Sequence, residues 1–322
     1  MEKQELVNDV QHILNAAKEL EIVVHAVPVG SENVFKVNIA KDSMPGLTEM
    51  FRNRLDELIR QPAYKIYDFS LVKDRSDGYY MFDMAEVPDK MKLLEDVIAN
   101  EYPLLNVIEH PIKSLDHLIV VLSDGKKPIS LYKKLHIGEK IYKSPHVWMG
   151  RYGGENSLEA INGELLRISG NFDVLYAGSK YVILDDGFAE KEFNMMSILK
   201  KESANGLTQV STTKLLKDVN KLASYSKTNS FARKLVKTVK ESKVVKAIND
   251  GKITNDDVFR FIDSIPELKA ELKVVGKKSK YISVNNKAQA NAFLDLLNDD
   301  FLVSELTQEK YIAIDKDPRK NE

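Results

Sequence analysis

The first third of the chain alternates between helical and extended hydrophobic patterns. Apolar residues recur at helical spacing from Glu2 to Leu20, which predicts an opening amphipathic helix. The β-branched run Ile22 to Val27 and the alternating run Val34 to Ile39 predict two strands joined as a hairpin. A second helical stripe follows Ser43, a suitable N-cap, and stops at Pro62.

Two further strands complete the pattern of this region. Tyr64 to Phe69 and Tyr79 to Phe82 are extended runs, separated by the turn-forming residues Asp74 to Gly78. We therefore expect an amino-terminal α/β domain over residues 1–115.

The middle of the chain has the clearest strand patterns. His117 to Leu122 is a buried-strand run that reverses into Pro128 to Tyr132. A second hairpin is predicted from Phe172 to Leu184, around Ala177-Gly178-Ser179. From Gly187 to about residue 272 the pattern is helical. Because strands come first and helices follow, the sequence predicts an α+β fold, with a second domain over residues 116–322.

The end of the chain returns to mixed elements. Tyr281 to Val284 predicts a strand, Asn286 to Leu297 a helix, and Phe301 to Ile314 a final hairpin. From about residue 254 this order is similar to a winged helix, in which Asn286 to Leu297 would be the recognition helix.

Composition narrows the class of protein. The 322 residues are 43% hydrophobic and 30% charged, which is typical of a folded soluble domain. Cysteine is absent, so disulfides and thiolate metal sites are excluded. Met1 to Leu20 does not have the pattern of a secretory signal, and no apolar run reaches the roughly 18 residues of a membrane span. We expect a cytoplasmic protein without transmembrane insertion.

Signatures of catalysis and of cofactor binding are missing from the sequence. The glycine-rich segment Met149 to Glu155 lacks the Gly-Lys-Ser/Thr of a phosphate-binding loop, and no Gly-x-Ser-x-Gly elbow occurs. The six histidines show no metal-ligand spacing. We therefore assign no catalytic residue, metal or cofactor, and expect binding in preference to covalent chemistry.

Positive charge is concentrated in one stretch of an otherwise neutral chain. Residues 214–246 carry ten positive and two negative side chains, a local charge of +8, whereas the whole chain has a formal charge of −1. The ten are Lys214, Lys217, Lys221, Lys227, Arg233, Lys234, Lys237, Lys240, Lys243 and Lys246. A second basic stretch contains Lys273, Lys277, Lys278, Lys280 and Lys287.

Within the first stretch, a helix is expected to begin at Ser230. Phe231, Leu235 and Val239 would form its apolar face, while cations project from another face. Phosphate is the natural counterpart of such a face, because neutralising phosphates releases condensed counterions. The DNA-binding candidates are Lys227, Arg233, Lys234, Lys237, Lys240, Lys243 and Lys246. The alternative interpretation is a solvated helix face with no ligand.

Two other functions are compatible with the residues. Asp185, Asp186 and Glu190, with Lys191 and Glu192 beside them, are candidates for a magnesium-dependent nuclease. Their spacing instead fits a turn followed by a helix start, where acids favour the positive end of the helix dipole. The other alternative is a non-catalytic scaffold, whose basic face meets an acidic protein or the anionic lipids around a membrane partner.

Two segments resemble a known family. Phe172 to Phe193 reads FDVLYAGSKYVILDDGFAEKEF, and Asn291 to Lys316 reads NAFLDLLNDDFLVSELTQEKYIAIDK. Both are similar to the KwaB-like family of the Kiwa anti-phage defence system, over roughly residues 117–320. The family pattern is carried by Leu296, Leu297, Asn298, Asp299, Ser304, Leu306, Thr307, Tyr311 and Lys316. The resemblance implies a cytoplasmic, dimeric bacterial effector that binds DNA and acts with a membrane-embedded partner protein, which could recruit it to the inner face of the membrane, to limit phage replication.

Overall fold

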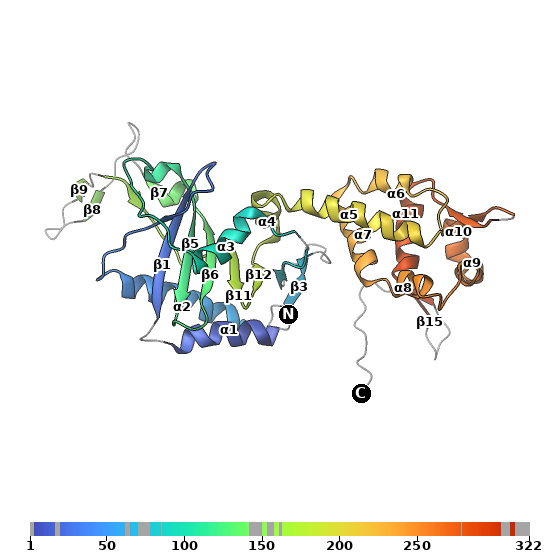
Figure 1. Cartoon of the computed structure of the whole chain (residues 1–322), viewed down its shortest axis with the longest axis horizontal. Coiled ribbons are helices and arrows are strands. Elements are labelled where there is room, and N and C mark those ends of the chain that lie inside the picture. The colour runs from blue at the N-terminus through green and yellow to red at the C-terminus, as the bar shows by residue number, and fades with distance from the viewer. Residues whose placement is uncertain are drawn as a thin grey trace. The chain divides into compact units, whose positions relative to one another are not determined.

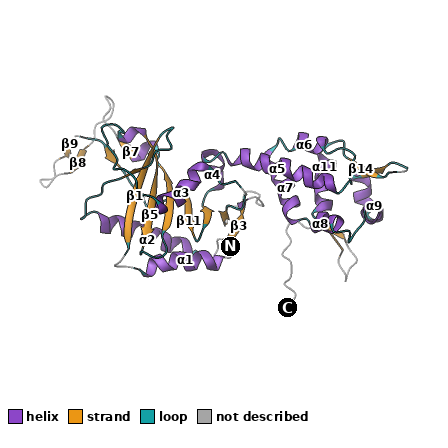
Figure 2. Ribbon diagram, viewed as in Figure 1, coloured by secondary structure: helices purple, strands orange, loops and turns teal. Residues whose placement is uncertain are grey.

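The structure is a computed structural model of the whole chain, and it forms two compact units. It describes residues 3–16, 20–61, 65–69, 78–84, 86–141, 150–152, 158–160, 163–277, 279–303 and 310–312. Unit 1 runs to Asn194 and unit 2 begins at Met195. Helices and strands are both abundant (Figure 2), which confirms the predicted α+β class.

Unit 1 is built on one mixed sheet, in which the described residues form eight strands in the order β2-β1-β5-β6-β11-β12-β4-β3. These strands are β1 (Glu21–Pro28), β2 (Phe35–Lys36), β3 (Lys65–Asp68), β4 (Gly78–Met81), β5 (Leu115–Ser123), β6 (Ile129–Lys134), β11 (Val174–Ala177) and β12 (Lys180–Ile183). All neighbours are antiparallel except β3 and β4. Two short pairs lie outside this sheet: β7 (Lys140–Ile141) with β10 (Leu165–Leu166), and β8 (Gly150–Tyr152) with β9 (Leu158–Ala160).

The pairing of β1 with β5 corrects the predicted domain boundary near residue 115. The two strands pair from Glu21 opposite Ser123 to Pro28 opposite Leu115. Strand β4, also from the first 115 residues, pairs with β12. Residues 1–115 and 116–194 thus contribute strands to one sheet, and the boundary between the compact units lies at residue 194 instead.

Helices cover both faces of the sheet. Helices α1 (Lys3–Asn15) and α2 (Met44–Arg60) pack on one face, and α3 (Asp89–Ala99) contacts β5 and β6 from the other (Figure 1). Alternate strand residues, such as Val24, Val120 and Leu131, are fully buried against α1 and α2. The residues between them face α3, and on that face the sheet carries His25, His117 and Tyr132. Strict alternation fixes the register, because a slip by one residue would exchange the two faces.

The two predicted hairpins of the middle region are confirmed. Strands β5 and β6 pair antiparallel, as do β11 and β12. Gly178 and Ser179 form the second turn with φ of 55° and 62°. Positive φ at both positions is what a two-residue hairpin turn of matching twist requires.

Unit 2 is mainly helical. Its helices are α5 (Met195–Thr212), α6 (Asn220–Tyr225), α7 (Asn229–Glu241), α8 (Lys243–Asn249), α9 (Asn255–Ser264), α10 (Pro266–Glu271) and α11 (Lys287–Leu297). Two short antiparallel pairs accompany them: β13 (Lys273–Val275) with β14 (Tyr281–Ser283), and β15 (Phe301–Val303) with β16 (Lys310–Ile312). The family-pattern residues Ser304, Leu306, Thr307 and Lys316 lie outside the described residues.

Helix α11 forms the centre of unit 2. Its side chains at Ala290, Ala292, Phe293, Leu294 and Leu297 are all at most 4% exposed, and it contacts α6, α7, α8 and α10. Lys287 and Ala288 in its first turn are its only fully exposed residues, so α11 offers little free surface to a DNA groove. The winged-helix expectation, with residues 286–297 as the recognition helix, is therefore wrong.

Candidate nucleic-acid interface

The predicted DNA-binding residues lie on three neighbouring segments of unit 2. Lys227 lies between α6 and α7, four of the cations belong to α7, and Lys243 and Lys246 belong to α8. Lys227, Lys240, Lys243 and Lys246 are exposed, whereas Arg233, Lys234 and Lys237 are half-buried.

Helix α7 is buried over a wider arc than its sequence pattern indicated. Ala232 and Val236 are buried beside the predicted Phe231 and Leu235, and Thr238 is only 1% exposed. The cause is packing on two sides, because α5 runs along one side of α7 and α11 along another. Such a helix has only a narrow strip left for solvent.

Two of the four cations of α7 face carboxylates of neighbouring helices. The Lys234 ammonium lies 2.6 Å from Asp295 Oδ1 and donates to the Asn291 carbonyl at 3.2 Å. The Lys240 ammonium lies 3.7 Å from Glu202 Oε2 on α5. The expected face of about four solvent-directed cations on α7 therefore needs correction.

The remaining predicted lysines lie towards opposite ends of α11. The Lys221 ammonium of α6 donates to Asn285 Oδ1 at 2.7 Å, just before α11 begins. At the other end, Ser242, the N-cap of α8, donates to the carbonyl of Leu297, the last residue of α11. An 11-residue helix is about 16 Å long, so Lys227 after α6 and the two lysines of α8 do not share one compact patch.

The structure instead brings lysines from both basic stretches together around the β13–β14 hairpin. Ile282 of β14 donates its backbone N–H to the Leu215 carbonyl at 2.7 Å, which fixes the segment before α6 against the hairpin. Around this junction lie seven exposed lysines, which we call the hairpin lysines. They are Lys214, Lys217, Lys221, Lys273, Lys277, Lys280 and Lys287.

The hairpin has one packed face and one outward face. Ile282 is buried and Val274 packs beside it in the core of unit 2. Lys273 and Tyr281 belong to the opposite face, because side chains alternate along a strand and cross-strand partners point the same way. The Lys217 ammonium lies over the Tyr281 ring, 5.8 Å from its centroid, and therefore joins this outward face.

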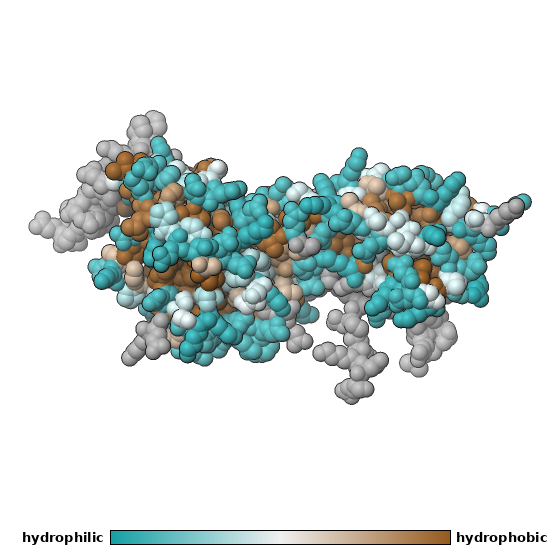
Figure 3. All heavy atoms as spheres, in the orientation of Figure 1, coloured by the Kyte–Doolittle hydropathy of each residue, from teal (hydrophilic) through white to brown (hydrophobic). Residues whose placement is uncertain are grey.

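The hairpin lysines are not neutralised within the part of the chain that the structure describes: none of their ammonium groups forms an ion pair there. Two of them, Lys277 and Lys280, border a hollow of about 440 Å³ together with the first turn of α9, where Asp256 is the acidic residue. Hydrophilic side chains cover most of this end of unit 2 on the face shown in Figure 3. The surface is thus positive, solvated and open to a large polyanion.

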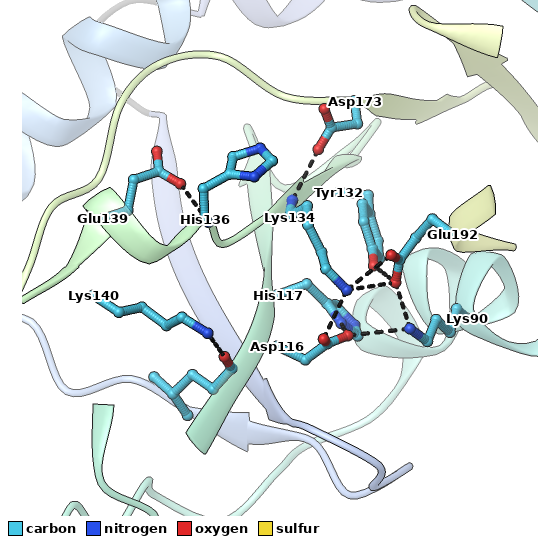
Figure 4. A network of polar contacts seen from close by, with 11 residues as sticks. Lys90, Asp116, His117, Tyr132, Lys134, His136, Glu139, Lys140, Asp173 and Glu192 are labelled. Carbon is cyan, nitrogen blue, oxygen red and sulfur yellow. Dashed lines mark hydrogen bonds and ion pairs between the residues drawn. The ribbon is translucent and has the colours of Figure 1, made fainter. Parts of the chain in front are cut away.

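Two of the acidic residues considered for a nuclease, Asp185 and Glu192, have other roles. Asp185 is the N-cap of α4 (Asp186–Glu192), and its side chain accepts from the Phe188 N–H at 2.9 Å. Glu192, at the end of α4, is held by lysines in the network of Figure 4. Among the described residues, no group of three acidic or histidine side chains is placed to hold a metal ion. The geometry gives the nuclease alternative no support.

The network around Glu192 is a set of largely buried charges, each of which contacts charges of opposite sign. Sequence reasoning missed this network. The Lys134 ammonium lies 2.7 Å from Asp116 and 2.8 Å from Glu192, and the Lys90 ammonium contacts the same two carboxylates (Figure 4). The Tyr132 hydroxyl donates to Glu192 at 3.0 Å. The network joins β5, β6, α3 and α4, because each element contributes at least one of these side chains.

The pKa values in this network follow from burial and pairing. Burial alone would raise the pKa of Asp116 and of Glu192, but hydrogen bonds from His117 and the lysines lower the first, and bonds from the two lysines lower the second. Burial alone would lower the pKa of Lys90, yet its bonds to the carboxylates raise it. Asp116, Glu192 and Lys90 therefore stay ionised at neutral pH, which suits a structural clamp.

Comparison with known proteins gives two matches. The family model described as "Kiwa protein KwaB-like" matches residues 112–307. The Kiwa protein KwaB of Escherichia coli O55:H7 (strain RM12579 / EPEC) is 24% identical over 247 residues, which cover 76% of each chain. No solved structure matches. Within the described residues, none of the helices is both long and apolar enough to span a bilayer.

Proposed function

Because the chain belongs to the Kiwa protein KwaB-like family, we propose that it binds DNA, largely through the phosphate backbone, and acts with a membrane-embedded partner to block phage replication. The family implies a role in Kiwa anti-phage defence. One observation supports the DNA-binding step: seven exposed lysines from two distant stretches gather around the β13–β14 hairpin, and none of them forms an ion pair with a residue that the structure describes.

This surface suits a phosphate backbone better than a protein or a small anion. Lysine ammonium groups on flexible stems meet phosphates as point charges without fixed geometry. Each neutralised phosphate releases condensed counterions, which favours binding to any sequence. We expect affinity without base specificity, because the hairpin lysines do not supply the arginine forks that commonly make bidentate base contacts.

The structure changes which predicted residues we propose as the main contacts. The hairpin lysines form the principal surface. Exposed Lys227, after α6, and Lys243 and Lys246 on α8 are proposed as secondary contacts. We propose that the α7 cations contribute least to DNA binding, because α7 is packed on two sides and two of these cations face acids. They are Arg233, Lys234, Lys237 and Lys240.

A matched pair of triple variants tests the assignment. The first carries Lys273→Glu, Lys277→Glu and Lys280→Glu in the hairpin. The control carries Lys227→Glu, Lys243→Glu and Lys246→Glu, at positions that are also exposed, and changes the formal charge by the same amount. Binding of a labelled 30-base-pair duplex is measured by fluorescence anisotropy at fixed ionic strength.

We expect the hairpin variant to lose about 100-fold in affinity and the control less than about tenfold. The reason is that the binding constant depends on roughly one power of the salt concentration for each phosphate contact, so each lost contact weakens binding severalfold. Circular dichroism melting verifies that both variants fold. Equal losses in the two variants would assign the binding to net charge alone. Unchanged affinity in the hairpin variant would contradict the proposed site and favour a scaffold that meets a protein or lipid partner.

The proposed partners need separate measurements. Co-purification with the membrane-embedded partner should survive nuclease treatment if protein contacts hold the two together. Light scattering of the purified chain should give twice the mass of 36.5 kDa if it forms the proposed homodimer. Cell fractionation tests the proposed cytoplasmic location: without the partner the protein should be in the soluble fraction.

A further inference from the structure

The outward face of the β13–β14 hairpin carries an aromatic side chain among its lysines. Tyr281 of β14 points away from the core of unit 2, because its neighbour Ile282 is buried there and side chains alternate along a strand. The Tyr281 side chain is half-buried, and so is that of its cross-strand partner Val275. Contacts between lysines and phosphates account for the positive charge of this surface, but they give no role to a partly exposed ring.

One face of the Tyr281 ring is open towards solvent. The Lys217 ammonium lies over this face, 5.8 Å from the ring centroid, and Lys217 itself is exposed. What lies over the ring is therefore a flexible surface side chain and not part of the packed core. A planar base can take this place, because the lysine stem has rotatable bonds and its ammonium can turn to the phosphate of the same nucleotide.

A second tyrosine, Tyr225 of α6, lies beside the end of the same strand. Its hydroxyl donates to the backbone carbonyl of Asn285 at 3.5 Å. Its ring contacts the ring of Phe231 in an edge-to-face arrangement, with the centroids 5.9 Å apart. Phe231 is 1% exposed, so this contact covers the inner side of Tyr225, which is itself half-buried and keeps part of its ring accessible. Lys221, one turn earlier on α6, donates to Asn285 Oδ1 at 2.7 Å, so a tyrosine and a lysine reach the same residue.

The two tyrosines are spaced along one short segment of the chain. Tyr281 and Asn285 are four residues apart, which is at most about 13 Å of extended backbone. Lys217 lies beside the first tyrosine and Lys221 beside the second, so rings and cations are interleaved along this line. Proteins that bind single-stranded DNA use this combination, in which bases stack on aromatic rings and cations follow the backbone. A duplex can meet the cations but not the rings, because its bases are paired and stacked on one another.

We propose that this surface prefers single-stranded to double-stranded DNA, with one base stacked on Tyr281, another on Tyr225 and the phosphates near them on Lys217 and Lys221. The proposal rests on the proposed function, because it takes the hairpin lysines as the DNA contact, and it adds the form of DNA that the surface selects. Every base has an aromatic face, so stacking adds affinity without adding sequence preference. The chain thus favours DNA at places where the two strands are separated.

Fluorescence anisotropy on the full chain tests the preference with three labelled probes: a 30-nucleotide thymidine strand, the 30-base-pair duplex, and a 30-unit abasic strand that has the phosphates but no bases. The wild type should bind the thymidine strand about 100-fold more tightly than the abasic strand, because each of two stacked bases contributes about tenfold. Its preference over the duplex should be about tenfold, since the higher charge density of a duplex offsets part of the stacking. Tyr281→Leu and Tyr225→Leu should each lower the ratio of single-strand to duplex affinity about tenfold, whereas the matched Phe variants keep the ring and should keep the ratio within about twofold.

The outcomes separate this preference from the proposed function. The hairpin triple variant should lose affinity for all three probes while their ratios stay nearly constant. Equal binding of the thymidine and abasic strands by the wild type would overturn the preference and leave DNA binding through lysines intact, and this comparison does not depend on the folding of any variant. Wild-type ratios in both leucine variants, shown to be folded by thermal melting, would overturn the assignment to the tyrosines. No binding of any probe by the wild type would overturn the preference and the proposed function together.

Discussion

Two groups of lysines carry the same charge in opposite surroundings. One group is Lys90 and Lys134 of unit 1, and the other is the hairpin lysines of unit 2. Lys134 has a side chain 21% exposed and touches two carboxylates that are only 12–13% exposed. The hairpin lysines are exposed and form no ion pair within the described structure. A charge buried with its partner is needed for stability, because removing one member of the pair leaves the other buried without a partner. An exposed, unpaired charge costs the fold little and is available to a ligand.

Helix α7 is an intermediate case. Its cations were the main sequence-based candidates for DNA binding, yet Lys234 and Lys240 each face an acid of a neighbouring helix. The difference teaches that a run of lysines identifies a binding surface only when the partners of each lysine are known. The predictions below test this distinction.

The largest expected effect is on stability in unit 1. Lys134→Met should lower the free energy of unfolding by about 3 kcal/mol, because Asp116 and Glu192 would lose a shared partner in a largely buried position. Lys280→Met in the hairpin is the matched control and should change it by less than about 0.5 kcal/mol. Urea denaturation followed by circular dichroism measures both. Equal midpoints for the two variants would remove the distinction between the two lysine groups.

The same clamp makes stability depend on pH. The pKa values of Asp116 and Glu192 are lowered in the folded state. Their contribution to stability is therefore fully present above the unfolded-state pKa values near 4, and it is lost as the pH falls through the folded-state pKa values. The wild type should therefore lose about 2 kcal/mol on acidification below about pH 5, and Lys134→Met should lose less. Parallel stability curves for the two proteins would show that Lys134 does not set these pKa values.

A smaller effect is expected on α7. Lys240→Glu places a second carboxylate beside Glu202, which is 14% exposed, and should cost about 1 kcal/mol of stability. Its effect on DNA affinity should be at most about threefold, because α7 is not the principal surface. Lys240→Gln, which removes the charge without reversing it, is the control and should cost less. A tenfold loss of DNA affinity with unchanged stability would restore α7 as the main interface.

The smallest effect concerns the contact between Lys217 and Tyr281. An exposed ammonium over a half-buried aromatic ring is worth about 0.5 kcal/mol, so Lys217→Ala should reduce stability by no more than that. DNA affinity should fall about threefold, since one of seven proposed phosphate contacts is lost. The pair Tyr281→Leu and Tyr281→Phe tests the ring: only the first should reproduce the stability loss.

Local patterns predicted much of this fold. Alternation placed β5, β6, β11 and β12, and the Gly178-Ser179 turn was recognisable because few residues tolerate its positive φ. The pairing of β1 with β5 was not predictable from pattern, because about 90 to 100 residues separate the paired positions. Helix α3 was not predicted, so the contacts of its Lys90 in the network around Glu192 were missed as well.

The candidate site was predicted only in part. Both basic stretches were recognised, but the contact of Leu215 with Ile282 that joins them is non-local. The burial of α7 did have a sequence signal. The doublets Phe231-Ala232 and Leu235-Val236 are one turn apart and widen the apolar arc beyond the single stripe that was inferred. The acid that faces Lys234 comes from α11, about 60 residues away, and no local pattern indicates it.

The salt dependence of DNA binding tests the central claim most directly. The slope of log K against log salt concentration counts neutralised phosphates, at about 0.9 per contact. The triple variant Lys273→Ala, Lys277→Ala and Lys280→Ala should therefore have a slope shallower than that of the wild type by about 2.7, whereas Lys227→Ala, Lys243→Ala and Lys246→Ala should change it by less than about 1. A hairpin variant with the wild-type slope would contradict the account, because those lysines would then neutralise no phosphate.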